Sequence, residues 1–127
     1  MPVPAPEILP GVRVVASPSS LAAAAWPDGM PVLPLADDEV LVLGEASVEV
    51  ADPEALILPE EGFCGVTMER EVLEAWMERE AEWPLPTTRA YFAQGMAAGL
   101  PVKVWVDGGQ ALLVTRASLS RDLEDRL

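Results

Sequence analysis

The sequence predicts an α+β fold: a small antiparallel sheet with two central helices and a C-terminal helix packed on it. Three observations support this fold class. Short apolar runs follow one another across brief turns, which favours antiparallel meanders over parallel strands with helical crossovers. Residues 66–84 place apolar side chains three and four positions apart, as an amphipathic helix does. Residues 89–98 and 118–127 carry helix start or stop signals.

The N-terminal twelve residues contain four prolines, at positions 2, 4, 6 and 10. Proline fixes φ and has no backbone N–H, so this segment favours an extended, polyproline-like chain. A length of 127 residues suits one domain. We therefore predict a proline-rich N-terminal arm over residues 1–12 and a single α+β domain over residues 13–127.

Five short segments of the first half are predicted strands: residues 12–16, 31–35, 40–43, 48–50 and 55–58. Two prolines restrict the second segment to the edge of a sheet. The third segment is continuously apolar, which predicts burial on both faces. Between the first two strands, Ser17-Pro18-Ser19-Ser20 begins a short helix that Pro27-Asp28-Gly29 ends.

The first central helix is predicted within the stretch of residues 66–84. Its apolar stripe consists of Met68, Val72, Leu73, Trp76 and Met77. Thr67 is the expected N-cap, because its hydroxyl can accept a hydrogen bond from a free N–H of the first turn. Pro84 ends the helix, since the residue before a proline avoids helical dihedrals.

The second central helix is predicted over residues 89–98, with Thr87 or Thr88 as its N-cap and Gly99 as its stop. Residues 102–106 alternate in polarity and form a predicted strand. Asp107-Gly108 then marks a hairpin turn that leads to a return strand over residues 111–115. Ser118 caps the terminal helix, in which three leucines at four-residue spacing share one face: Leu119, Leu123 and Leu127.

The chain has a formal net charge of −13. Such a charge repels nucleic acid and anionic membrane surfaces, so we expect neither as a partner. It attracts basic protein surfaces, either of a single partner or of a larger complex. The N-terminal segment has neither the basic residues nor the apolar run of a signal peptide, and no apolar run approaches the length of a membrane-spanning helix. These features predict a cytoplasmic protein.

Histidine is absent and Cys64 is the only cysteine. Histidine is the commonest general base at neutral pH and the commonest metal ligand. Without it the chain can build no Ser-His-Asp triad, no Cys-His pair and no zinc site with imidazole ligands. We therefore expect no catalytic residue, cofactor or metal ion, and regard an enzyme as the less favoured interpretation.

The candidate binding residues are four glutamates of the first central helix, with two tryptophans as apolar anchors: Glu71, Glu74, Glu78, Glu82, Trp83 and Trp105. Like charges three or four residues apart destabilise a helix by roughly 0.2–0.5 kcal/mol per pair. A chain that keeps them can use that face to meet a cationic partner. The alternative is an ordinary solvated face. Tryptophan is enriched in interface hot spots, although a core position is the commoner one.

These observations predict a non-enzymatic acidic accessory or interaction protein that binds a basic protein partner. Two alternatives stay open. One is a small subunit of a heteromeric enzyme, or an enzyme that works with carboxylates and a divalent cation. The other is a homo-oligomeric structural protein in which the proline-rich arm and apolar strand edges join neighbouring subunits.

Overall fold

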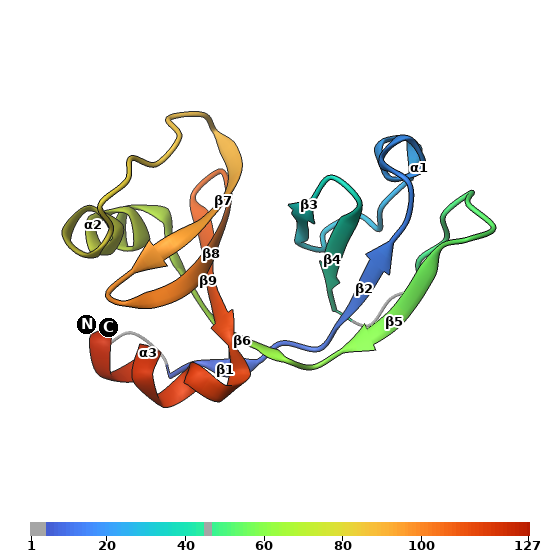
Figure 1. The fold of residues 1–127 in the computed structure, drawn as a ribbon. Helices are drawn as coiled ribbons and strands as arrows, with labels where there is room; N and C mark the ends of the chain where they lie inside the picture. The colour runs from blue at the N-terminus through green and yellow to red at the C-terminus, as the bar shows by residue number, and fades with distance from the viewer. Residues whose placement is uncertain (1–4, 45–46) are drawn as a thin grey trace. The chain divides into compact units, whose positions relative to one another are not determined.

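The computed structural model describes residues 5–44 and 47–127, which form a mostly β structure (Figure 1). The chain divides into two compact units, one made of residues 1–8 and 62–127 and the other of residues 9–61. Each unit contains one antiparallel sheet. The predicted α+β fold with two central helices is therefore wrong, because one of those two helices is a strand.

The first unit holds a five-stranded sheet in the order β1-β6-β9-β8-β7. Its strands are β1 (Glu7–Ile8), β6 (Phe63–Glu69), β7 (Ala90–Ala97), β8 (Leu100–Asp107) and β9 (Gln110–Arg116). The helices of this unit are α2 (Arg70–Glu80), the 3-10 helix η1 (Ala117–Leu119) and α3 (Ser120–Arg126). Residues 1–4 of the predicted arm lie outside the described residues. Farther along the arm, β1 pairs with β6, with Ile8 opposite Cys64.

The second predicted helix is the strand β7, which pairs with β8 along its whole length. Ala98 (φ 53°) and Gly99 (φ 77°) form the turn between these strands. Two successive positive φ angles match the twist of a two-residue hairpin, and glycine adopts them without steric cost. Gly99, which the sequence suggested as the stop of a helix, instead closes a hairpin. Pairing with β8 overrides the weak helical preference of the segment.

The helix α2 is shorter than predicted because β6 continues to Glu69. Thr67 pairs with Leu112 in the ladder between β6 and β9, so it caps nothing. Glu69 occupies the N-cap position, without a side-chain cap bond. Within α2 the buried residues are Leu73, Trp76 and Met77, as the apolar stripe predicts. Val72 is 44% exposed, which the prediction of a buried position missed.

The hydrophobic core of the first unit lies between one face of the sheet and the helices α2 and α3. Val102, Val104 and Val106 alternate inward along β8 and join Leu73 and Leu123 in this core. The predicted hairpin of β8 and β9 is confirmed, with Gly108 and Gly109 between the paired ends of the strands. The short C-terminal helix is held by two bonds to the rest of the unit. Trp76 Nε1 donates to Arg126 O (2.8 Å), and Arg126 Nε donates to Ala98 O (2.8 Å).

The second unit contains a four-stranded sheet in the order β3-β4-β2-β5. Its elements are β2 (Gly11–Val15), α1 (Pro18–Ala23), β3 (Val32–Ala36), β4 (Glu39–Leu43) and β5 (Leu56–Glu60). The proline-containing strand β3 lies at an edge and residues 40–43 of β4 are buried, as predicted. Ser17 caps α1, because its Oγ accepts from Ser20 N (3.2 Å). The predicted strand at residues 48–50 does not form.

Asp52 connects the turn before β5 to the start of α1. Its carboxylate accepts one hydrogen bond from Ser17 N (2.9 Å) and another from Glu54 N (2.9 Å). These two backbone donors stabilise the ionised form and lower the pKa of the Asp52 carboxyl below its usual value. No helix among the described residues combines the length and apolarity needed to cross a membrane.

The contrast between Leu73 and Val72 tests the packing of α2. We expect Leu73→Ala to lower the free energy of unfolding by about 2–5 kcal/mol, because it leaves a cavity under a fully buried position. The neighbouring Val72→Ala should change it by less than about 0.5 kcal/mol. Urea denaturation followed by circular dichroism measures both. Equal losses in the two variants would contradict the orientation of the helix.

Candidate binding groove

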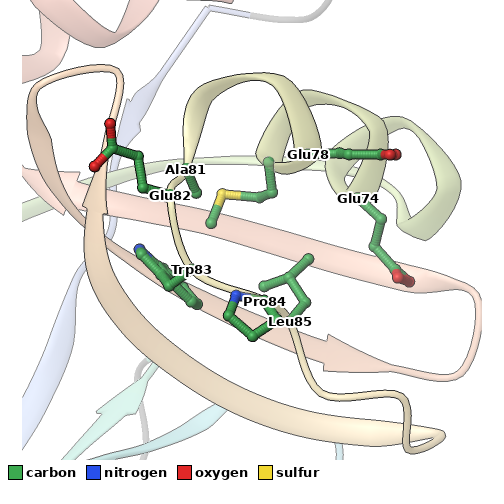
Figure 2. Close-up of a pocket in the computed structure, with 8 residues that line it drawn as sticks. Glu74, Glu78, Ala81, Glu82, Trp83, Pro84 and Leu85 are labelled. Atoms are coloured by element: carbon green, nitrogen blue, oxygen red, sulfur yellow. The ribbon is translucent and has the colours of Figure 1, made fainter.

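A groove of about 440 Å³ runs between the second half of α2 and the segment that follows it (Figure 2). Three glutamates and five less polar residues line it: Glu74, Glu78 and Glu82, with Met77, Ala81, Trp83, Pro84 and Leu85. In Figure 2, Glu74 and Glu78 extend from the helix, and Glu82 lies at the opposite end. The groove therefore combines a largely apolar floor with carboxylates at both ends.

The local sequence explains why the chain turns back beneath the helix. Glu74 and Glu78 are four residues apart, which places them on one face of α2. Ala81 leaves the helix with extended dihedrals (φ −108°, ψ 144°), and its N–H still bonds to Met77 O. Pro84 keeps the preceding residue out of helical geometry. The segment after α2 then runs as an extended strip that carries Trp83 and Leu85.

Trp83 is fixed in the groove by its contacts with β7. Its Nε1 donates a hydrogen bond to Met96 O (2.8 Å). The indole lies so close to Gly95 that a Cβ at that position would come within 2.8 Å of the ring. Ala98 N also donates to Glu80 O (2.9 Å), and Ala81 forms an isolated bridge to Ala97. The end of α2 and the side chain of Trp83 are therefore both held against β7 and the turn that follows it.

The three groove glutamates differ in their neighbours. Glu74 forms an ion pair with Arg70, whose other donors bond to the carbonyls of Thr88 (2.7 Å) and Arg89 (2.7 Å). Within the part of the chain that the structure describes, no ion pair involves Glu78 or Glu82. The charge of Glu74 is thus partly balanced inside the protein. Glu78 and Glu82 are both exposed to solvent.

Tyr91 lies next to this ion pair. The Arg70 guanidinium stands 5.4 Å from the centre of its ring. Its hydroxyl is buried and has no hydrogen-bond partner among the described residues. Burial raises the pKa of Tyr91 above its usual value, the charge of Glu74 raises it further, and Arg70 opposes both. Tyr91 therefore reports on the electrostatics of Glu74.

The structure brings together four of the six residues that the sequence suggested for binding: Glu74, Glu78, Glu82 and Trp83. Glu71 is exposed in the first turn of α2 and does not line the groove. Trp105 lies on β8, on the sheet face opposite Val104 and Val106, between Phe92 and Leu112 in the strand register.

Sequence reasoning missed Leu85 and Gly95 as parts of the site. Leu85 follows Trp83 and Pro84 in a short apolar segment, which was a usable signal for a lining residue. Gly95 gave no such signal, because it lay within a predicted helix. Its proximity to Trp83 follows only from the position of β7.

Among the described residues, no group of three or more acidic or cysteine side chains is arranged to hold a metal ion. Searches against protein-family models, curated proteins and solved structures gave no match. An apolar floor with carboxylates at its ends suits a side chain that has an apolar stem and a cationic head.

Substitution of Gly95 tests the seat of Trp83. We expect Gly95→Ala to push the indole away from Met96, and to cost about 1–3 kcal/mol of stability through overpacking. The indole N–H resonance of Trp83 in a ¹⁵N-resolved NMR spectrum should shift as its hydrogen bond is lost. Gly109→Ala is the matched control, because a Cβ there meets nothing within 4 Å. An unchanged Trp83 resonance in Gly95→Ala would refute the contact.

Titration of Tyr91 tests its coupling to Glu74. Tyr91 is the only tyrosine, so the absorbance change on phenolate formation reports this group alone. We expect its pKa to lie above 10.0 in the wild-type protein. Glu74→Gln removes a negative charge that disfavours the phenolate, so it should lower that pKa. Glu80→Gln, an exposed change on the same helix, should leave it where it is; equal shifts would argue against a specific coupling.

Proposed function

We propose that this protein is a non-enzymatic acidic accessory protein that binds a basic segment of a protein partner in the groove. The main support is the exposed pair Glu78 and Glu82 at the border of an apolar floor that contains Trp83 and Leu85. Carboxylates alone would be a weak argument, since an exposed ion pair contributes only about 0.2–1 kcal/mol. The adjoining apolar surface gives a bound side chain a second source of affinity.

A lysine or arginine side chain of the partner matches both parts of the groove. Its methylene stem can cover Trp83 and Leu85 while its charged head reaches Glu78 or Glu82. A cation over the indole face adds about 0.5–1 kcal/mol at an exposed site. Arginine also suits the carboxylates because it can donate two parallel hydrogen bonds. We therefore propose an arginine-containing or lysine-containing segment as the ligand.

The net charge of −13 acts at longer range. It raises the rate of encounter with a basic surface, and salt screens this effect over about 10 Å at 0.1 M ionic strength. The same charge disfavours nucleic acid and anionic membranes as partners. We propose that the protein acts in the cytoplasm, either with one basic protein or as part of a larger complex.

Binding of a defined peptide tests this proposal. We expect a capped Arg-Leu-Arg peptide, added to the ¹⁵N-labelled protein at low salt, to shift the Trp83 indole resonance and the amides of residues 78–83 and of Leu85. A Glu-Leu-Glu peptide should shift neither. Each charge removed by Glu78→Gln and Glu82→Gln should weaken binding roughly 1.5-fold to 5-fold.

The double variant Glu71→Gln with Glu124→Gln is the matched control, because it removes the same charge from exposed positions outside the groove. If this control weakens binding as much as the groove variants do, the interaction depends on net charge alone. The groove would then not be the binding site. The same conclusion follows if the Trp83 resonance does not move on titration.

A further inference from the structure

The strand β5 presents three consecutive apolar residues at an edge of the four-stranded sheet. Leu56 is 56% exposed, Ile57 42% and Leu58 50%. An edge strand has unpaired backbone groups along one side, and native proteins usually shield such an edge. Three large apolar side chains at an open edge are therefore unusual, and they lie in the unit that does not contain the groove.

Backbone bonds of β2 show which groups of β5 point outward. Ala16 N donates to Asp38 O (3.1 Å), and Gly44 N donates to Pro10 O (2.8 Å), both toward β4. Because backbone groups alternate along a strand, the odd-numbered residues of β2 face β5. Their partners in β5 are Leu56, Leu58 and Glu60.

The intervening residues Ile57 and Pro59 therefore direct their backbone groups away from β2, to the open edge. Proline has no N–H, so β5 offers there the N–H of Ile57 and the carbonyls of Ile57 and Pro59. One residue of an added antiparallel strand can exchange two backbone hydrogen bonds with Ile57, one through its N–H and one through its carbonyl. Pro59 limits the ladder to a few residues, which favours a short peptide segment over an extended aggregate.

The charges around β5 argue against a second copy of the chain as its occupant. Residues 9–61 hold ten acidic residues and the single base Arg13, a net charge of −9. That base is already engaged by Glu39 (3.0 Å) and Glu60 (2.7 Å). Antiparallel self-pairing about Ile57 would bring the Glu60–Glu61 end of each copy beside the turn that contains Glu54 in the other. Like charges in that position destabilise the pair.

We propose that the open edge of β5 binds an extended segment of a basic protein by strand addition. The segment has three consecutive apolar residues, and a lysine or arginine about three positions to either side of the central one. Its apolar residues contact Leu56, Ile57 and Leu58, and its two bases lie near Glu54 at one end and near the Glu60–Glu61 end at the other. This surface shares no residue with the groove, so the proposal does not rest on the function assigned to that groove.

NMR titration of the full-length protein with the capped peptide Lys-Thr-Val-Ile-Val-Thr-Lys tests this surface. We expect saturable shifts in the amides of residues 54–58 and of Glu60, with the largest at Ile57. A peptide with glutamate in place of both lysines should bind roughly ten-fold more weakly or not at all. Equal binding of the two peptides, or shifts confined to the groove, would overturn the proposal.

Two β5 variants separate the backbone from the side-chain contribution. Ile57→Pro removes the outward N–H and leaves the bonds to β2, so it should weaken binding roughly ten-fold. Ile57→Val keeps the N–H and should bind within about two-fold of the wild type. If Ile57→Pro disturbs the fold, Leu56→Ser with Leu58→Ser provides the same test through the exposed side chains. Wild-type affinity in the folded variants would sink the proposal.

The groove variant Glu78→Gln with Glu82→Gln should leave the peptide-induced shifts of the β5 amides as they are in the wild type, even where it weakens binding of a lysine side chain in the groove. The site-resolved shifts therefore keep the two surfaces experimentally distinct. Sedimentation of the protein without peptide measures its oligomeric state and so tests whether a second copy of the chain occupies the edge. A dimer that Ile57→Pro dissociates would show that a second copy fills the edge, against the charge argument. A monomer at the concentrations of the titration supports the assignment to a basic segment.

Discussion

The close contact between Trp83 and Gly95 is the constraint on which the groove depends. The indole can lie against β7 only because residue 95 has no side chain, and its N–H then reaches the carbonyl of Met96. This contact fixes the strip after α2, which in turn positions Leu85 below the carboxylates of the helix. The binding surface is therefore a consequence of strand packing, and the glutamates alone do not create it.

Sequence patterns predicted the elements whose apolar residues follow a clear pattern. The strand β8 and the buried side of α2 follow from regular apolar spacing, and β4 and β9 follow from continuous apolar runs. Residues 90–97 could not be assigned in this way. Their small and aromatic side chains fit either period, and pairing with β8 decided the outcome. The same ambiguity concealed Gly95, although the acidic helix face and Trp83 were visible in the sequence.

Charge is distributed unequally between the two units. Residues 9–61 carry a net charge of −9, and the only base there lies between two carboxylates on neighbouring strands. In the first unit, Arg70 balances Glu74 and also holds the loop before β7 through backbone carbonyls. Arginines in both units thus serve the internal structure, and the remaining carboxylates give each surface its attraction for cations.

The pairing of Ile8 with Cys64 has a consequence for how this chain can change over evolutionary time. The main chain leaves the five-stranded sheet after β1 and re-enters it at β6, at two directly opposed positions. The two ends of the intervening segment, residues 9–61, therefore lie beside each other, as the ends of a long loop do. Its length and surface can vary without altering the register of the remaining strands. Such an arrangement lets one polypeptide acquire new specificities in one module while the other keeps its architecture.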